Sequence, residues 1–127
     1  IAAKGIKEAR YHLEHAAEWT VRLGDGTAVS HQRMQDALNR VWRYWGELFE
    51  TDQVLEAVVA AGIAPDPATL RAAADRTLSA VLDQATLDRP TTTSIVGTGR
   101  SGRHSEHLGF LLAEMQYLHR QHPGATW

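Results

Sequence analysis

The chain has 127 residues, of which 43% are hydrophobic and 22% charged, and its formal net charge is −2. This composition is typical of a globular protein, and the charge gives no electrostatic reason to expect nucleic acid or a membrane as partner. The sequence has no cysteine, which excludes disulfides and thiolate chemistry, and no apolar run near the ~20 residues that a bilayer requires. A cytoplasmic location is expected.

A first helix is predicted from Ala2 to about Leu23, where Gly24-Asp25-Gly26 ends the pattern. Its helical pattern has begun by about residue 4 and the chain starts with Ile, so we expect a piece of a longer protein. An apolar stripe at helical spacing indicates the buried face, and it consists of Ile6, Ala9, Leu13, Ala16, Ala17 and Thr20.

A second helix is predicted from an N-cap at Ser30 to about Glu50. Thr51 or Asp52 is expected to cap a short third helix that ends at Gly62. The apolar seam of the second helix is unusually regular, and it consists of Met34, Leu38, Val41, Trp45 and Leu48, widened by Trp42 and Phe49.

Asp66-Pro67 combines an N-cap residue with proline at the first helical position, which predicts a fourth helix to about Leu87. Residues 88–103 are rich in Pro, Thr, Ser and Gly and are expected to form a loop. A fifth helix is predicted from about Ser105 to His122. The fourth helix buries a line of Leu70, Ala74, Thr77, Val81 and Ala85. The pattern predicts an all-α segment of about five helices over residues 1–127, with antiparallel neighbours joined by short loops.

The first candidate site lies on the first helix. A carboxylate-bridged di-iron site needs Glu-x-x-His, which places both ligands on one helix face. Here Glu8 is followed three residues later by Tyr11, and histidine comes one position late as His12. A neutral phenol is a poorer iron ligand than imidazole. Glu8, His12 and His15 supply at most half of a metal site, so hydrogen bonding inside a bundle or at a subunit contact is the favoured interpretation.

The second candidate is the motif Gly97-x-Gly99-x-x-Gly102, which matches the dinucleotide-binding fingerprint. That fingerprint needs a βαβ unit, and the following 25 residues predict one helix and a tail. An alternative is that Arg100, Arg103 and the N-terminus of the fifth helix hold an anion.

The third candidate is the C-terminal segment, where His104 and His107 lie one turn apart and Glu114 lies two turns further on. A zinc or iron site is possible with these side chains, but a docking helix is favoured. The terminal Trp127 is a large aromatic residue, and its side chain is expected to pack against another protein surface. The predicted partner interface consists of Trp42, Trp45, His104, His107 and Trp127. No complete catalytic constellation is found.

Three segments resemble a known family: KEARYHLEH at residues 7–15, RMQDALNRVWRYWGELFE at 33–50 and GRHSEHLGFLLAEMQYLHRQHPGATW at 102–127. They are similar to the C-terminal half of the structural subunit of bacterial phenylacetyl-CoA epoxidases, the PaaC family. The spacing of Gly, Pro and Asp around residues 62–74 resembles the same family, so the similarity extends through essentially the whole chain.

The resemblance implies a ferritin-like four-helix bundle, of which this chain is the C-terminal part. It implies a catalytic di-iron subunit as partner, in a complex that also has an accessory subunit and a flavin/iron–sulfur reductase. That complex epoxidises the ring of phenylacetyl-CoA in aerobic phenylacetate breakdown. Glu8 and Tyr11 match the positions where the catalytic paralogue has Glu and His, so the resemblance implies no catalytic residue and no cofactor in this chain.

A full subunit of this family is about twice as long, so the first helix is expected to expose a face that other helices normally cover. We therefore expect the fragment to associate with a copy of itself or with another chain. One alternative is a ferritin-like subunit that keeps its own metal and oxygenase activity, using Glu8 with His12 after a small rotation of the helix. The other is a CoA-binding role for the loop that holds Arg100 and Arg103.

Overall fold

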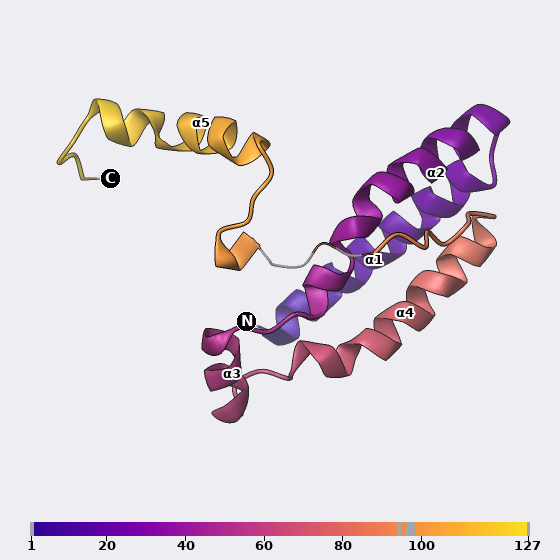
Figure 1. The fold of residues 1–127 in the computed structure, drawn as a ribbon, viewed down its shortest axis with the longest axis horizontal. Helices are drawn as coiled ribbons and strands as arrows, with labels where there is room; N and C mark the ends of the chain where they lie inside the picture. Colours follow the sequence, from indigo (N-terminus) through magenta and orange to yellow (C-terminus); the bar gives the residue numbers. More distant parts are fainter. Residues whose placement is uncertain (1, 94, 96–98, 127) are drawn as a thin grey trace. The chain divides into compact units, whose positions relative to one another are not determined.

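The computed structural model of the chain describes residues 2–93, 95 and 99–126. These residues form five α-helices and three short 3-10 helices and contain no β-strand (Figure 1). The all-α class predicted from the sequence is confirmed, and the helices are consistent with part of a ferritin-like bundle. The chain divides into two compact units, Ile1–Ile95 and Val96–Trp127, and each has its own description below. The single segment over residues 1–127 stays a prediction.

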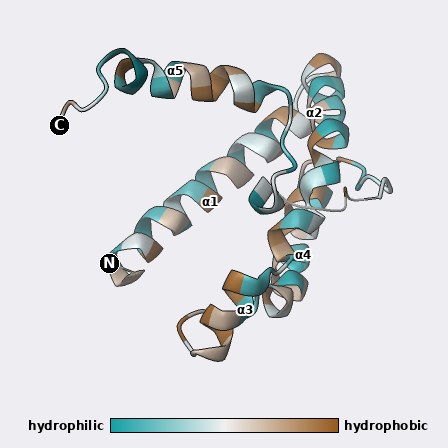
Figure 2. Ribbon diagram, turned by 60° about the vertical axis from the view of Figure 1, so that its left-hand side comes forward, coloured by the Kyte–Doolittle hydropathy of each residue, from teal (hydrophilic) through white to brown (hydrophobic). Residues whose placement is uncertain are grey.

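Helix α1 spans Ala2–Gly24, so its predicted end is correct to within one residue. Hydrophilic and hydrophobic residues both occur along it (Figure 2), and the apolar ones recur at the spacing of an amphipathic helix. The backbone N–H of Asp25 still donates to the carbonyl of Val21 at 2.9 Å, and the chain then turns sharply into α2. Helices α1 and α2 contact each other along this hairpin, and α1 also contacts α4.

Helix α2 spans Ala28–Val41, and its N-cap is Thr27 rather than the predicted Ser30. The two residues form a reciprocal capping box. The Thr27 hydroxyl accepts from the backbone N–H of Ser30 at 3.2 Å, and the Ser30 hydroxyl accepts from the N–H of Thr27 at 2.9 Å. The prediction was wrong by three residues because Ser30 serves at the N3 position, where a Glu or Gln usually stands. His31 Nδ1 lies 2.8 Å from the Gly24 carbonyl oxygen and ties the hairpin together.

The prediction that the second helix continues to Glu50 was also wrong. The α-helix ends at Val41 and gives way to two 3-10 helices, η1 (Trp42–Tyr44) and η2 (Gly46–Phe49). The backbone N–H of Trp45 donates to the carbonyl of Trp42 at 2.9 Å, which is the tighter i to i+3 pattern. Gly46, a weak helix former, is the first residue of η2 and is buried.

Helix α3 spans Gln53–Ala60, and Asp52 is its N-cap as one of the two predicted options. The Asp52 carboxylate accepts from the backbone N–H of Leu55 at 2.8 Å. The chain leaves the helix through Gly62, whose φ of 69° lies in the left-handed region that favours glycine.

Helix α4 spans Pro67–Gln84, and the predicted Asp66-Pro67 start is confirmed. The Asp66 carboxylate accepts from the backbone N–H of Ala68 at 2.9 Å. The predicted end at Leu87 was too late, because Thr86 adopts a φ of 55°. The N–H of Leu87 then donates to the carbonyl of Leu82 at 3.0 Å, a closing bond of the Schellman type.

The core of the first unit is small. Leu82, Ala85 and Leu87 are its buried cluster, at the C-terminal end of α4. Four partly buried side chains from α1, α2 and α4 pack against this cluster, and they are Val21, Met34, Leu38 and Leu78. Most other large apolar side chains in this unit remain exposed, including Ile6 and Leu70 from the predicted buried stripes. The helices are thus held together mainly at one end of the α1–α2 hairpin.

The second unit contains the 3-10 helix η3 (Gly99–Ser101) and helix α5 (His107–Gln121). Helix α5 starts two residues after the predicted Ser105 and ends one residue before His122. Its apolar residues recur at helical spacing and most of them are exposed in this structure, namely Leu111, Leu112, Met115 and Leu118. Among the described helices of both units, none is long and apolar enough to cross a membrane.

Candidate functional site

The first unit has an apolar groove between α1, α2 and α4. Its volume is about 530 Å³, and its lining is almost entirely apolar. Each of the three helices contributes part of the stripe that the sequence marks as its buried face. The contributors include Leu13, Ala16 and Ala17 from α1, Met34, Leu38 and Val41 from α2, and Ala74, Thr77 and Val81 from α4. The predicted buried stripes therefore face one another, but across open space.

A different face of α1 presents a row of rings. The Tyr11 ring stacks on His15 with centroids 5.9 Å apart, and His15 meets Trp19 edge to face at 6.3 Å. The Arg22 guanidinium lies over the Trp19 ring at 5.1 Å from its centroid. These residues do not line the groove, and Tyr11 is 60% exposed and Trp19 46% exposed. The α1 ring stripe is the name used below for this row: Tyr11, His15, Trp19 and Arg22.

The degenerate ligand positions Glu8 and Tyr11 do not fit a di-iron centre within this chain. Both side chains are exposed, and Tyr11 makes its ring contacts with His12 and His15. In the part of the chain that the structure describes, no three His, Asp or Glu side chains come together in a way that could hold a metal ion. One carboxylate beside a phenol is a small part of the six-residue ligand set of such a centre.

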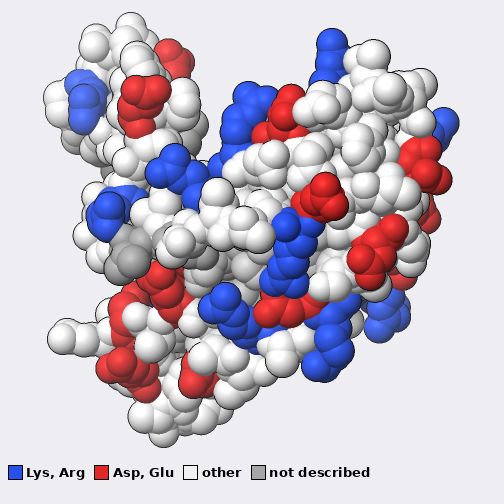
Figure 3. Space-filling model, turned by 45° about the vertical axis from the view of Figure 1, so that its right-hand side comes forward, with Lys and Arg blue, Asp and Glu red and all other residues white. Residues whose placement is uncertain are grey.

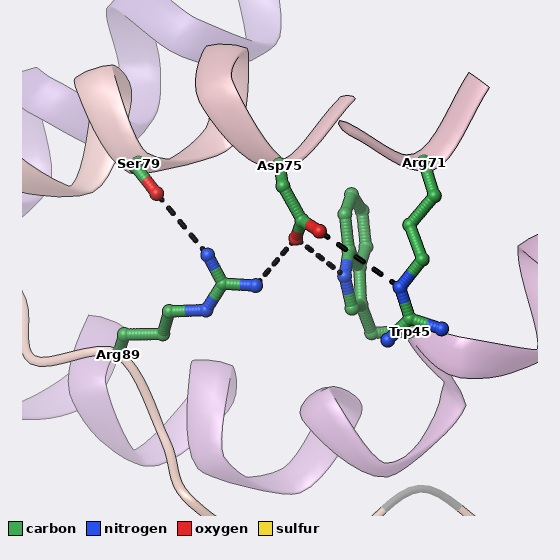
Figure 4. Close-up of polar contacts among 5 residues, drawn as sticks. All are labelled: Trp45, Arg71, Asp75, Ser79 and Arg89. Atoms are coloured by element: carbon green, nitrogen blue, oxygen red, sulfur yellow. Dashed lines mark hydrogen bonds and ion pairs between the residues drawn. The ribbon is translucent and has the colours of Figure 1, made fainter. Parts of the chain in front are cut away.

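A cluster of charges that sequence analysis missed is centred on Asp75 of α4 (Figure 4). Its carboxylate accepts hydrogen bonds from Arg89 and, at 3.2 Å, from the indole Nε1 of Trp45. Arg71 Nε lies 3.8 Å from the other carboxylate oxygen, and Arg89 also donates to the Ser79 hydroxyl at 3.1 Å. The only signal for this cluster in the sequence is the helical spacing of Arg71 and Asp75, because Arg89 lies beyond the end of α4.

These contacts favour the ionised form of the Asp75 carboxyl. The hydrogen bond from Arg89 lowers the pKa of the Asp75 carboxyl below its usual value, partial burial opposes this, and the bond from Trp45 and the charge of Arg71 add to the lowering. A carboxylate held ionised in this way is not suited to act as a general acid near neutral pH. The cluster joins Trp45, between η1 and η2, to α4 and to the segment after α4, so its role is structural.

The two tryptophans of the predicted interface belong to the same region. Trp42 and Trp45 stack with centroids 6.0 Å apart, and Trp45 meets Phe49 edge to face at 5.2 Å. The Arg89 guanidinium lies 5.0 Å from the centroid of the Trp42 ring, whose residue is only 7% exposed. Trp42 is therefore used in the packing of its own unit and offers little surface to a partner. Trp45 is half-buried and lines the apolar groove.

The loop expected over residues 88–103 begins as an ordered segment against α2. The Gln35 side chain donates to the Asp88 carbonyl at 2.9 Å and accepts from the Asp88 N–H at 2.8 Å. Further along, the N–H of Ile95 donates to the Arg43 carbonyl at 2.9 Å.

Positive and negative side chains are interspersed over the face of the molecule that Figure 3 shows, with wide uncharged areas between them.

The remaining predicted residues lie in the second unit. His104 is exposed in the connection after η3, and His107 is exposed at the start of α5. Of the glycine motif, Gly99 begins η3 and Gly102 has a φ of 86°, whereas Gly97 lies outside the described residues, as does Trp127. The described residues contain no strand, so the dinucleotide interpretation lacks the unit that it requires.

Comparison with known proteins identifies the family. The family model described as phenylacetic acid catabolic protein, PaaA_PaaC, matches residues 1–127. The chain belongs to this family. One of the subunits of the 1,2-phenylacetyl-CoA epoxidase of Escherichia coli (strain K12) is a curated relative, 50% identical over 127 residues. That alignment covers 100% of this chain and 51% of the relative, so the chain spans about half the length of the relative it matches.

Proposed function

We propose that this chain is part of the structural subunit of a phenylacetyl-CoA epoxidase and acts in aerobic phenylacetate catabolism. The observation that supports this proposal most strongly is the 50% identity to the Escherichia coli epoxidase subunit along the entire chain. At that level of identity, half of the aligned positions carry the same residue as a protein whose printed name is that of one component of an epoxidase.

In this proposal the subunit is not catalytic. Its role is to bind and stabilise a related subunit that holds the di-iron centre and activates oxygen. The support is the donor chemistry of α1, where Tyr11 stands at the position that a Glu-x-x-His motif gives to histidine. In addition, the Tyr11 ring is stacked on His15 rather than directed at Glu8 and a shared metal.

The surface proposed to bind the catalytic subunit includes the α1 ring stripe. Exposed Trp, Tyr and Arg side chains are typical of the residues that contribute most of the binding energy at protein interfaces. Trp19 and Arg22 already pack on each other, so little side-chain freedom would be lost on binding. The earlier interface predictions at Trp42, Trp45, His104, His107 and Trp127 stay predictions.

The first experiment tests complex formation. The full-length subunit and the catalytic subunit are mixed at micromolar concentration and analysed by size-exclusion chromatography with light scattering. A stable complex that elutes ahead of either component is expected. Replacement of Trp19 by Ala should weaken the complex at least tenfold, whereas Val29→Ala, an exposed apolar position in the first turn of α2, serves as the matched control. Separate elution of the two wild-type subunits would contradict the proposal.

The second experiment separates a structural subunit from a second oxygenase. Iron is measured by atomic emission in each purified full-length subunit and in the complex. We expect iron to follow the catalytic subunit and to be far below one equivalent in the subunit that contains this chain. A full equivalent of iron in the latter, lost on Glu8→Ala, would show instead that this subunit holds a metal of its own.

The isolated 127-residue chain is also proposed to self-associate. Eighteen large hydrophobic side chains are exposed among the described residues, and many lie along single helix faces. Light scattering should therefore give a concentration-dependent mass above that of the 14.0 kDa monomer. A constant monomer mass over a hundredfold range of concentration would contradict this expectation.

A further inference from the structure

Residues 42–49, which follow α2, combine two helical tendencies. In the sequence, the apolar seam of α2 continues through Trp45 and Leu48 at α-helical spacing. In the structure, the same residues form η1 and η2, two 3-10 helices with Trp45 alone between them. Runs of 3-10 helix beyond three or four residues are uncommon, because their hydrogen bonds are poorer than those of an α-helix. We therefore looked for a contact outside the segment that favours the 3-10 form.

The backbone of this segment remains close to an α-helix. Trp45 has a φ of −58° and a ψ of −41°, which are α-helical values. The N–H of Trp42 still donates to the carbonyl of Leu38, its α-helical partner. The N–H of Trp45 then donates to the carbonyl of Trp42 in place of that of Val41. A shift of the acceptor by one residue is thus enough to convert one form into the other.

The contact outside the segment is the carboxylate of Asp75 on α4 (Figure 4). One of its oxygens, Oδ1, accepts hydrogen bonds from both Arg89 and the indole Nε1 of Trp45. The other oxygen pairs with Arg71 at 3.8 Å. Asp75 therefore holds Trp45 directly and holds both arginines by charge.

Both arginines also lie over aromatic rings of residues 42–49. The Arg89 guanidinium lies 5.0 Å from the centroid of the Trp42 ring, and the Arg71 guanidinium lies 5.4 Å from that of the Phe49 ring. A cation over an aromatic face is attracted by the ring quadrupole. Through the two arginines, the carboxylate thus holds a ring at each end of the segment, in addition to the tryptophan at its middle.

The two helical forms place these rings differently. A 3-10 helix turns by about 20° more and rises by about 0.5 Å more for each residue than an α-helix. Over residues 42–49 the α-helical form would therefore be shorter by about 4 Å, and the later rings would point in a different direction. In that form, at least part of the contacts with Asp75 and its two arginines would be lost.

We propose that residues 42–49 are a two-state segment with an α-helical and a 3-10 form, and that the ion pairs of Asp75 with Arg71 and Arg89 hold it in the 3-10 form. An event that separates Arg89 from Asp75 shifts the balance toward the α-helical form, because the arginine contacts favour only one of the two forms.

The form of this segment determines where α3 lies. Helix η2 packs on α4, whereas α3 packs directly on no other element among the described residues. Its position relative to α2 is therefore set by the segment between them. Val54 of α3 and Ile63 after it are 66% and 78% exposed, so a change of form moves an apolar surface without opening the buried core.

The test measures the form of residues 42–49 by NMR in the full-length subunit, purified alone. A nuclear Overhauser effect from the Hα of Trp42 to the amide of Gly46 indicates an α-helix, and one from the same Hα to the amide of Tyr44 is strong in a 3-10 helix. The intensity ratio of the first signal to the second is compared between wild type, Asp75→Asn and Asp83→Asn, a matched substitution on α4 that removes neither ion pair. Unfolding in urea confirms that each variant is folded.

In Asp75→Asn the ratio is expected to rise at least tenfold, and in Asp83→Asn it should change by less than twofold. An unchanged ratio in folded Asp75→Asn would overturn the inference, because the local sequence around Gly46 would then set the 3-10 form. Loss of both signals would overturn it as well, since the segment would then have no α-helical alternative.

Arg89→Gln is a milder variant that keeps the proposal testable if Asp75→Asn does not fold. It preserves the bond from Trp45 to the carboxylate but removes the charge over Trp42, so the ratio should rise at least threefold. Arg22→Gln is its matched control, because Arg22 also lies over a tryptophan ring but belongs to α1. Equal ratios in the two arginine variants would contradict the proposal. Because the catalytic subunit is absent, a failure of complex formation leaves these results unaffected.

Discussion

The last residue of α1, Gly24, lies directly against Ala85 at the end of α4. A Cβ atom built on Gly24 would come within 2.5 Å of the Ala85 carbonyl oxygen and 2.8 Å of the Ala85 Cβ, distances far below van der Waals contact. Ala85 is fully buried, and Leu87 beside it is part of the same cluster. The absence of a side chain at Gly24 therefore permits the closest approach of α1 to α4 and the formation of the small core.

Gly24→Ala is expected to destabilise the protein by about 1–3 kcal/mol, because the new methyl group must displace backbone rather than a flexible side chain. This cost exceeds the up to about 1 kcal/mol that alanine gains over glycine in a helix. Gly5→Ala on the same helix is the control, since nothing lies within 4 Å of its Cβ and a gain of up to about 1 kcal/mol is expected. Urea unfolding of the full-length subunit measures both. Equal effects at the two positions would exclude the steric explanation.

Gln35→Ala should cost about 1–3 kcal/mol, because it removes both hydrogen bonds that hold the Asp88 backbone. Gln32→Ala in the same helix is the matched control. The Gln32 side chain donates to Asp36 within α2 at 3.0 Å and holds no other segment, so a change of no more than about 0.5 kcal/mol is expected. Unfolding midpoints in urea report the difference. A loss as large for Gln32 as for Gln35 would show that the bonds to Asp88 do not stabilise the fold.

The stability of the subunit should depend on the ionisation of Asp75. Its folded-state pKa is lowered, chiefly by Arg89, so its stabilising contribution is present above the unfolded-state pKa and is lost as the pH falls through the folded-state pKa. At neutral pH, Asp75→Asn should lower the urea midpoint. Below about pH 4 the difference between wild type and variant should shrink, since the wild-type carboxyl becomes neutral as well.

Asp83→Asn is the control for this pH dependence. Asp83 lies on the same helix as Asp75, and its side chain makes no ion pair in the described part of the chain. Its substitution should shift the midpoint little at any pH. A difference between wild type and Asp75→Asn that stays constant from neutral to acid pH would show that the variant loses packing or hydrogen bonding rather than the ionised carboxylate.

Tyr11→His in the 127-residue chain provides the Glu-x-x-His spacing with Glu8, but iron binding should stay far below one equivalent. One glutamate and one histidine are only part of the ligand set of a carboxylate-bridged di-iron site, and the described residues contain no group that completes it. Atomic emission after dialysis against Fe(II) measures the bound metal. Near-stoichiometric iron in this variant would show that the ligand set is nearly complete within the chain.

Local signals in the sequence determined the helical elements. Asp52 and Asp66-Pro67 begin α3 and α4 as predicted, because capping depends only on side chains and N–H groups within one turn. The same locality explains the errors. Thr27 and Ser30 are both good capping residues three positions apart, and the sequence does not show which of them leaves the helical conformation. Likewise, the apolar residues within 42–49 keep α-helical spacing, which predicts that the α-helix continues. The chain instead forms 3-10 turns there.

By itself, the sequence determined the all-α class, the apolar stripe of each helix and the resemblance that the family comparison confirmed. Only the tertiary structure decided that these stripes surround an open groove, and that Arg89 reaches Asp75 and Trp42 after the chain turns at Thr86. The physical reason is one of range. Periodicity shows that a helix has an apolar face, because neighbours on that face lie three or four residues apart. Which surfaces then meet depends on how whole helices pack, which no local pattern contains.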